Sequence, residues 1–143
     1  MVLNPEIWGP QYWFVLYTIA LSYPENPNEV TKKKYYDFIQ NLPLFIPISD
    51  IGNNFSIFLD KYPVTPYLDS RESFVKWVHF IHNKINLYLG KPEINYYTAM
   101  KNYYDKYELK DIKKKNEFLS KHKFIFFSII IILLILCIIL HKY

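Results

Sequence analysis

Cysteine is nearly absent from this chain, and glycine is scarce. Among 143 residues there are 3 glycines and a single cysteine, Cys137. One cysteine cannot close an internal disulfide, so a disulfide-stabilised scaffold is excluded. The 4 histidines form two widely separated pairs, His79 with His82 and His122 with His141, and this spacing does not favour a zinc site.

Positive charge is also missing from most of the chain. The net charge is +4, but residues 1–109 are close to neutral, whereas residues 110–123 hold six lysines and only two acidic residues. The basic character therefore belongs to one short segment, and we expect no nucleic-acid partner. Hydrophobic residues make up 51% of the chain and charged residues 21%, a composition that predicts a packed core rather than disorder.

One long apolar run lies near the C-terminus. Residues 124–140, FIFFSIIIILLILCIIL, contain no charged residue. As a helix, a run of this length spans about 25 Å, which lies within the range for a bilayer core. The other interpretation is a buried core helix, but such a helix would show a polar stripe, and here only Ser128 is polar. The run predicts a transmembrane tail anchor over residues 123–141.

Lysines on either side of the run predict its orientation. Six lysines precede the run within residues 110–123, and Lys142 follows it. The positive-inside rule then places the N-terminal domain on the cytoplasmic side. We expect a single-pass membrane protein that contacts its membrane through residues 124–140, with residues 108–122 as a basic stalk. Cys137 lies within the run and is interpreted as an apolar filler.

Glycine and proline divide residues 1–107 into short blocks whose apolar residues recur with helical spacing. No block alternates with period two, so no sheet is expected. The predicted fold class is all-α: a four-helix bundle plus a short fifth helix, followed by one C-terminal transmembrane helix. The predicted helices run from Pro10 to Ala20, from an Asn28 cap to about Leu42, from Ser49 to near Tyr62, from a Ser70 cap to Leu89, and onward from Pro92.

The fourth predicted helix carries polar side chains along one face. His79, His82 and Asn86 follow one another at spacings of three and four, and Asn83 lies one position away. With Trp77 on the same helix, they offer an aromatic face and several hydrogen-bonding edges, as a planar heteroaromatic ligand requires. By themselves, the same residues also fit the solvent-facing side of an amphipathic helix.

Two other segments have the same two interpretations. Trp13 and Tyr17 lie four residues apart, just after Gly9 and Pro10, and could be core aromatics or ligand contacts. Lys91 follows the Leu89-Gly90 corner, where a lysine can reach a phosphate or remain on the surface.

Together these segments resemble the ERV/ALR family of FAD-linked sulfhydryl oxidases, in its viral form. The patterns W-G-P-x-x-W-x-x-L-x-x-x-A-x-x-Y-P and W-x-x-x-x-H-N-x-x-N-x-x-L-G-K-P match residues 8–24 and 77–92, and the resemblance covers residues 7–107. The resemblance implies an FAD-binding helical domain over residues 1–107 with this same helix count. The cofactor contacts it implies are Gly9, Pro10, Trp13, Tyr17, Trp77, His82, Asn83, Asn86, Lys91 and Tyr103.

The chain departs from the family at the redox pair. Where the family has C-x-x-C at the start of the third helix, this chain has Ile48-Ser49-Asp50-Ile51. Isoleucine can neither attack a flavin nor resolve an adduct, so no catalytic residue is predicted. No metal site is predicted either.

Three functions remain open at this stage. The first is a membrane-anchored FAD-linked sulfhydryl oxidase family protein, whose family activity is thiol oxidation to disulfide with oxygen as acceptor, impaired or inactive alone. The second is a non-catalytic FAD-binding or dimerisation module that recruits an active oxidase or another partner to a membrane, as a homodimer or heterodimer. The third, a tethered helical domain without cofactor, leaves the polar face of the fourth helix unexplained. A viral origin would make the membrane that of the host or the virion.

Overall fold

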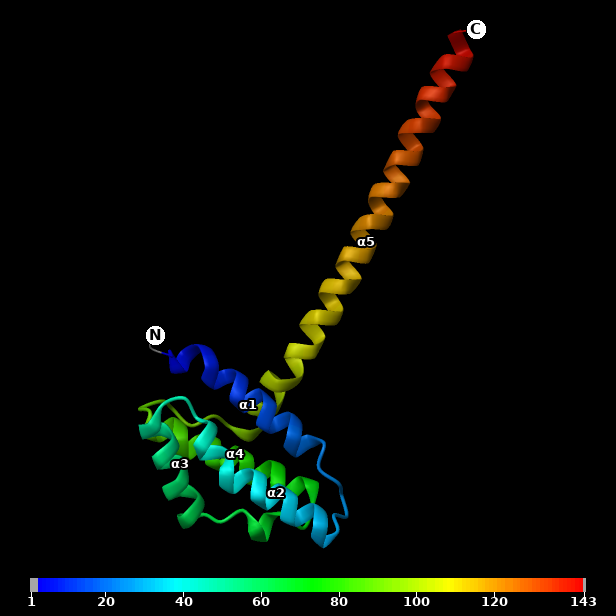
Figure 1. Cartoon of the computed structure of the whole chain (residues 1–143). Helices are drawn as coiled ribbons and strands as arrows, with labels where there is room; N and C mark the ends of the chain where they lie inside the picture. Colours follow the sequence, from blue (N-terminus) through cyan, green and yellow to red (C-terminus); the bar gives the residue numbers. More distant parts are fainter. Residues whose placement is uncertain (1–2, 143) are drawn as a thin grey trace. The chain divides into compact units, whose positions relative to one another are not determined.

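The structure, a computed structural model, describes the backbone of residues 3–142 and the side chains of residues 3–107 and 118–132. All regular secondary structure in this part of the chain is helical, as the sequence predicts (Figure 1). The chain divides into two compact units, Met1–Lys101 and Asn102–Tyr143. The predicted boundaries at residues 107 and 122 are not tested by this division and stay predictions.

Helix α1 (Pro5–Leu21) begins five residues before the predicted start at Pro10, so that prediction was wrong. The side chain of Asn4 accepts a hydrogen bond of 2.9 Å from the backbone N–H of Glu6. Pro5 occupies the first helical position, where its missing N–H has no cost. Pro10 therefore lies inside the helix, where it removes one backbone hydrogen bond without ending α1.

The next three helices follow the predicted boundaries closely. They are α2 (Glu29–Asn41), α3 (Ser49–Lys61) and α4 (Arg71–Tyr88). The predicted caps are confirmed: Asn28 accepts from the backbone N–H of Thr31 at 2.8 Å, and Ser70 accepts from that of Ser73 at 3.2 Å. Short 3-10 turns, η1 (Leu42–Phe45) and η2 (Thr65–Tyr67), lie between α2 and α3 and between α3 and α4.

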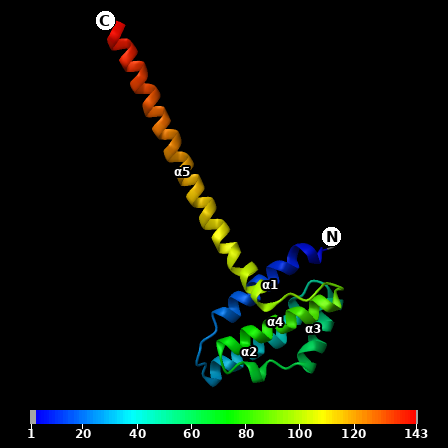
Figure 2. The ribbon, with the colours of Figure 1, turned by 180° about the vertical axis from the view of Figure 1, so that it is seen from behind.

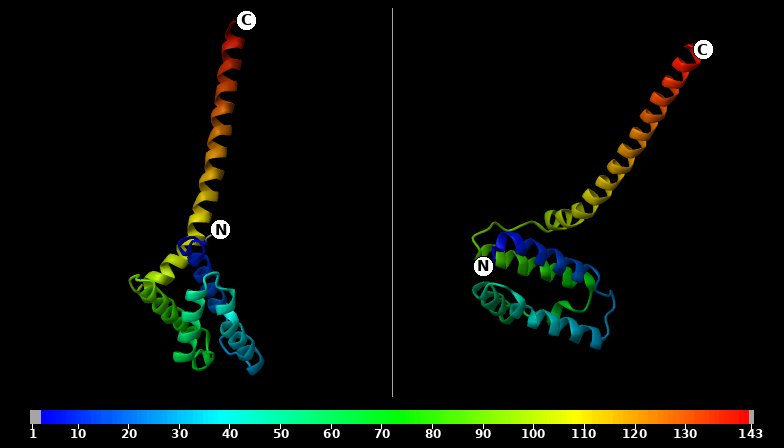
Figure 3. Two further views of the ribbon diagram at one scale, coloured as in Figure 1. Left: turned by 60° about the vertical axis from the view of Figure 1, so that its left-hand side comes forward. Right: turned by 45° about the horizontal axis from the view of Figure 1, so that its top comes forward.

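Helix α4 is the centre of the first unit. Both α1 and α3 contact it, and α1 lies alongside it (Figures 2 and 3). Full burial of one large apolar side chain stabilises a fold by roughly 1.5–3 kcal/mol. The face of α4 that packs against α1 and α3 therefore dominates the core. The buried side chains of α4 are Phe74, Val75, Trp77, Val78, Ile81, Ile85 and Asn86, and those of α1 and α3 are Leu16, Tyr17, Ala20, Ile51, Phe55 and Leu59.

Gly52 sets the position of the first turn of α3. A Cβ atom at this residue would lie 2.8 Å from the carbonyl oxygen of Pro43 in η1, closer than real Cβ atoms approach. Only glycine allows this contact without a shift of the backbone. Ile51, which the resemblance aligns with the second family cysteine, directly precedes Gly52.

Helix α5 (Tyr96–Lys142) is continuous over 47 residues. The prediction of a separate short fifth helix was therefore wrong. The sequence contains no glycine or proline between these two residues, so nothing interrupts the backbone hydrogen bonds. Residues 96–101 of α5 belong to the first unit, and the remainder belongs to the second.

Among the residues whose side chains are described, none of the helices combines the length and apolarity needed to cross a bilayer. Residues 133–141 of the predicted transmembrane segment, and residues 108–117 of the predicted stalk, lie outside those residues.

Candidate functional site

The predicted ligand residues of α1 and α4 meet where these two helices pack. The hydroxyl of Tyr17 lies 3.2 Å from Nδ1 of His79 and 3.2 Å from Nδ1 of His82. Trp13, one turn earlier on α1, stacks on the imidazole of His82, with ring centroids 4.1 Å apart and an interplanar angle of 19°. The spacing of four on α1 and three on α4 places each pair on one helix face. We call Trp13, Tyr17, His79 and His82 the histidine cluster.

Asn83 connects the histidine cluster to the loop after α4. Its Oδ1 accepts from the backbone N–H of Ile94 at 2.9 Å, and its Nδ2 donates to the carbonyl oxygen of Ile94 at 2.9 Å. The same Nδ2 lies 3.3 Å from Nε2 of His79. Nδ2 of the buried Asn86 lies 3.4 Å from Oδ1 of Asn83. The predicted face of α4 is therefore a connected hydrogen-bond network rather than a set of solvated polar groups.

Burial keeps the polar groups of the histidine cluster uncharged. Loss of hydration lowers the pKa of His82 to about 4, with smaller contributions from the positive charges of His79 and Lys91. Burial also lowers the pKa of His79 and raises the pKa of Tyr17. At neutral pH both imidazoles and the phenol therefore act as neutral hydrogen-bonding groups.

Lys91 follows the left-handed corner at Gly90, which ends α4. Gly90 has φ +69°, a conformation that glycine adopts without strain. The backbone N–H of Lys91 donates to the carbonyl oxygen of Asn86 at 2.8 Å, which fixes the corner. The ammonium group pairs with the carboxylate of Glu6 on α1, with Nζ and Oε1 2.7 Å apart. A phosphate bound by Lys91 would have to share its ammonium group with the carboxylate of Glu6.

Gly9 lies beside open space on α1. A Cβ atom placed there would meet no other heavy atom within 4 Å. Glycine within a helix is about 1 kcal/mol less favourable than alanine, and packing in the described part of the chain does not require it here. The neighbouring Pro10 is exposed. This side of α1 therefore has room for further atoms at Gly9.

Two further predicted cofactor contacts, Trp77 and Tyr103, are described by their own partners. Trp77 is only 2% exposed, and its indole N–H donates to the carbonyl oxygen of Tyr62 at 3.1 Å, so it is a core residue of the first unit. Tyr103 belongs to the second unit, where its hydroxyl lies 3.0 Å from that of Tyr107. Their predicted contacts with a flavin stay predictions.

The two residues that the resemblance aligns with the family cysteines lie at the start of α3. Ile48 is the N-cap residue, without a side-chain hydrogen bond to the helix, and Ile51 is buried in the first turn. One turn further, the ring of Phe55 lies 6.5 Å from the indole of Trp13, measured between centroids. The second turn of α3 thus reaches the histidine cluster through the aromatic ring of Phe55.

Several partners in this site were missing from the predicted set. His79 was placed on the polar face of α4 but was not assigned to the ligand, although its spacing of three from His82 was the available signal. Nothing in the sequence indicated the backbone of Ile94 as the partner of Asn83, or Glu6 as the partner of Lys91.

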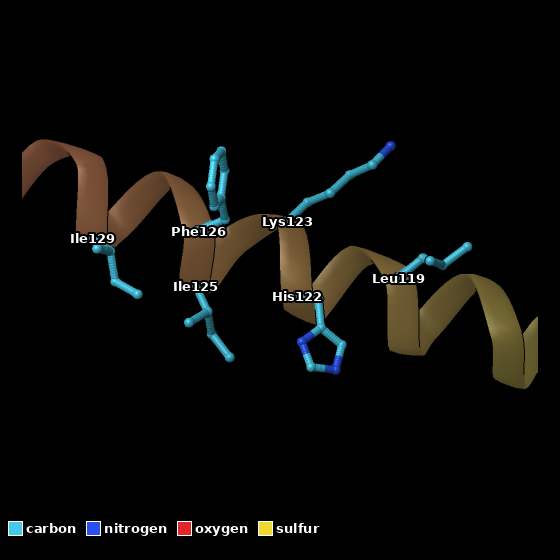
Figure 4. A pocket seen from close by; sticks show the side chains of 6 residues that line it. All are labelled: Leu119, His122, Lys123, Ile125, Phe126 and Ile129. Atoms are coloured by element: carbon cyan, nitrogen blue, oxygen red, sulfur yellow. The ribbon is translucent and has the colours of Figure 1, made fainter.

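A concave surface on α5 does not form a site comparable to the histidine cluster. Figure 4 shows its six side chains, all of which come from one helix, so no second element among the described residues closes it. The described residues also contain no group of histidine, cysteine or acidic side chains that could hold a metal ion. The lining residues on α5 are Leu119, His122, Lys123, Ile125, Phe126 and Ile129.

The helical unit has the fold of a known class of flavoprotein structure. It superimposes on the crystal structure of the yeast Erv1 core with a TM-score of 0.64 and 25% sequence identity, covering 72% of this chain and 86% of that one. The FAD-binding domain of Erv1 from Saccharomyces cerevisiae gives a TM-score of 0.65 and 26% identity, covering 73% and 97%.

Sequence comparison identifies the family. The profile of the Erv1 / Alr family matches residues 10–108, and the chain belongs to this family. It is 39% identical over 99 residues to a probable FAD-linked sulfhydryl oxidase of Acanthamoeba polyphaga mimivirus, covering 68% of this chain and 69% of the relative. It is 33% identical to the mitochondrial FAD-linked sulfhydryl oxidase erv1 of Schizosaccharomyces pombe, covering 61% of this chain and 48% of that protein.

Proposed function

We propose that this chain binds FAD at the histidine cluster and, acting alone, is impaired or inactive as a thiol oxidase. The observation that carries the proposal is the chemistry of the donor set. Trp13 supplies a flat aromatic face, and His82 and Asn83 supply neutral polar edges within a half-buried network. The open space at Gly9 lets a ligand approach the backbone of α1. These groups fit a flavin, and the relatives that match over this region are described as FAD-linked.

The impaired chemistry follows from the residues at the start of α3. Oxidation of a dithiol to a disulfide releases two electrons and two protons, and it begins with a thiolate. When bound, FAD supplies the two-electron acceptor. Ile48 and Ile51 provide no sulfur, and the only cysteine, Cys137, lies in the apolar run at residues 124–140. The chain therefore lacks a group of its own that could deliver electrons to the cofactor.

Membrane attachment through residues 124–140 is part of the proposal. The support is the uncharged run itself and the six lysines that precede it within residues 110–123. With this arrangement, the helical domain faces the cytoplasm as the N-terminal part of a single-pass protein. Because viral relatives match this chain, the receiving membrane is proposed to belong to the host or the virion.

A second candidate function is a non-catalytic module that pairs with another chain. The observation that favours it is the exposed apolar turn η1, where Leu44 is 79% exposed and Phe45 is 68% exposed. The hydroxyl of Tyr12 on α1 donates to the carbonyl oxygen of Phe45 at 2.7 Å, which ties this turn to the first helix. A second copy of this chain, or an active oxidase, would cover these side chains as a homodimer or heterodimer.

The test of the proposed function uses the full-length protein, purified in detergent with excess FAD. The proposal predicts a bound-flavin absorbance spectrum after removal of free FAD. His82→Ala and Asn86→Ala should lower flavin content, because each removes a hydrogen-bonding group that is worth about 1 kcal/mol. Leu87→Ala, which truncates an exposed side chain of the same helix, is the matched control and should leave flavin content unchanged. Colourless wild-type protein would contradict the proposal.

A further inference from the structure

Residues 90–95, which we call the α4–α5 loop, are held against α4 at two points. At the first, the backbone N–H of Lys91 donates to the carbonyl oxygen of Asn86 at 2.8 Å. At the second, the side-chain amide of Asn83 pairs with both backbone groups of Ile94: Oδ1 accepts from the N–H and Nδ2 donates to the carbonyl oxygen, each at 2.9 Å. Because Asn83 and Asn86 are three residues apart, both attachments come from one face of α4.

The backbone between these two points has little freedom of its own. Gly90 forms the corner with φ +69°, a left-handed conformation. Only Pro92 and Glu93 lie between the two attached residues. Proline has a fixed φ and restricts the residue before it, Lys91, to extended conformations. The attachments at the two ends therefore determine where the backbone of Lys91 lies.

Lys91 is the only cationic residue of the α4–α5 loop. Its Nζ lies 2.7 Å from Oε1 of Glu6, and 41% of the lysine side chain is exposed, so an anion from solvent can reach the ammonium group. A lysine ammonium is a point charge on a flexible stem. The position of its backbone therefore decides which partners the charge of Lys91 can reach.

Asn83 already has a protein neighbour at each of its hydrogen-bonding positions. A side-chain amide has two N–H donors and two acceptor lone pairs. Ile94 takes one of each, Nε2 of His79 lies 3.3 Å from Nδ2, and Nδ2 of Asn86 lies 3.4 Å from Oδ1. A ligand can bond to Asn83 only by sharing or displacing one of these contacts, and displacement of Ile94 would release the loop.

We propose that Asn83 is a positioning residue, which holds the α4–α5 loop against α4 and thereby places the Lys91 ammonium where it can bind a phosphate of FAD. This inference rests on the proposed function for the identity of the ligand and on the predicted contact of Lys91. It differs from the direct cofactor contact that the resemblance implies for Asn83, because the effect of Asn83 on binding passes through Lys91.

The attachment of the loop is tested without ligand, by hydrogen–deuterium exchange of the full-length protein in detergent. The readout is the set of peptides that cover residues 90–96. Asn83→Ala removes both hydrogen bonds to Ile94 and should raise the exchange rate of the Ile94 amide on the order of tenfold. Asn83→Asp keeps an acceptor for this N–H but places a carboxylate against the carbonyl oxygen, so it should raise the rate less.

Asn54→Ala is the matched control for exchange. The amide of Asn54 also donates to a backbone carbonyl oxygen, that of Asp50, but within α3, so exchange of residues 90–96 should stay at the wild-type rate. Asn83→Asp has the size of the native residue and decides the question if Asn83→Ala does not fold. Wild-type exchange in the folded Asn83 variants would overturn the proposal.

The route through Lys91 is tested by flavin titration of Asn83→Ala, Lys91→Ala and the double variant. Lys91→Ala removes a charge-assisted contact and should weaken FAD binding about tenfold. Asn83→Ala alone should weaken it about fivefold, but it should add almost nothing to Lys91→Ala, because the loop then has no ammonium group to place. Lys33→Ala removes a lysine that is paired with Asp37 on α2, and it should leave the affinity unchanged.

The two proposals fail in different ways. Wild-type protein that binds no FAD contradicts the proposed function, and exchange in the same sample still decides whether Asn83 holds the loop. Wild-type protein that binds FAD, but with losses from Asn83→Ala and Lys91→Ala that multiply in the double variant, leaves the proposed function intact and overturns this inference.

Discussion

The indole of Trp13 lies flat on the imidazole of His82, with centroids 4.1 Å apart and ring planes 19° apart. This stack joins α1 to α4, and it removes one face of the imidazole from water. Burial is the main cause that lowers the pKa of His82 to about 4. A histidine held neutral in this way has consequences for stability that can be measured without any ligand.

The first prediction concerns pH and stability. The pKa of His82 is about 4 in the folded protein, below the unfolded value of about 6.5. Between these two values the unfolded chain binds more protons, so stability rises with pH. The free energy of unfolding should therefore be highest above about pH 6.5 and should fall as the pH is lowered to about 4, by at most about 1.4 kcal/mol per pH unit for this group.

Urea unfolding followed by tryptophan fluorescence measures this effect, because Trp8, Trp13 and Trp77 all belong to the first unit. His82→Gln should flatten the pH dependence in this window. His122→Gln removes an exposed histidine from α5 and should not. An equal slope for wild type and His82→Gln would show that His82 is not held neutral by folding.

The second prediction separates ligand binding from stability at Gly9. Gly9→Ala should stabilise α1 by up to about 1 kcal/mol, because alanine is the better helix former and no atom obstructs its methyl group. The same methyl group should lower FAD affinity, because it occupies the space left for the ligand. Gln11→Ala, at an exposed position of the same helix, is the control for affinity. Thermal melting and flavin titration check both effects, and unchanged affinity in Gly9→Ala would place the ligand elsewhere.

The third prediction concerns the contact between η1 and α3. Gly52→Ala would bring a methyl group to 2.8 Å from the backbone oxygen of Pro43, so one of the two elements must move. We expect a loss of about 1–3 kcal/mol in the free energy of unfolding, as for other overpacked sites. Ser56→Ala, at an exposed position one turn later in α3, should cost little. Equal midpoints for the two variants in urea unfolding would rule out the tight contact.

The fourth prediction tests the proposed membrane anchor. Full-length protein should remain in the membrane pellet after extraction with alkaline carbonate. Ile131→Lys places a charge near the middle of residues 124–140 and should move the protein toward the supernatant, because a central lysine costs roughly 2.5–3.5 kcal/mol on insertion. Ser120→Lys adds the same charge before the run and should leave the protein in the pellet. Wild-type protein found in the supernatant would contradict the anchor.

The helix boundaries that could be predicted are those set by local chemistry. The side chains of Asn28 and Ser70 each accept a hydrogen bond from the backbone N–H three residues later. Because this contact is local, the sequence alone was enough to predict where these two helices begin. The start of α1 was missed because both Pro5 and Pro10 can occupy a first helical position, and the Asn4 cap decides between them. The length of α5 was missed although its sequence contains no helix-breaking residue.

The residues of the candidate site could be predicted from the sequence, but the hydrogen bonds that join them could not. Helical spacing put His82, Asn83 and Asn86 on neighbouring positions of one helix, which the structure confirms. The bridge from Tyr17 to two histidines depends on how α1 packs against α4, and the sequence does not encode that register locally. The partner of Asn83 is a backbone segment in a loop, for which no side-chain pattern exists.

We propose that the chain binds FAD but lacks the dithiol that would deliver electrons to it. The most direct measurement is dithiothreitol-dependent oxygen consumption by FAD-loaded, full-length protein, compared with the Ile48→Cys/Ile51→Cys double variant. Wild type should not exceed free FAD. The double variant should gain activity, because its two thiols lie at the N-terminus of α3, where the helix dipole lowers a thiol pKa. Robust oxygen consumption by wild-type protein, retained in Cys137→Ser, would contradict the account.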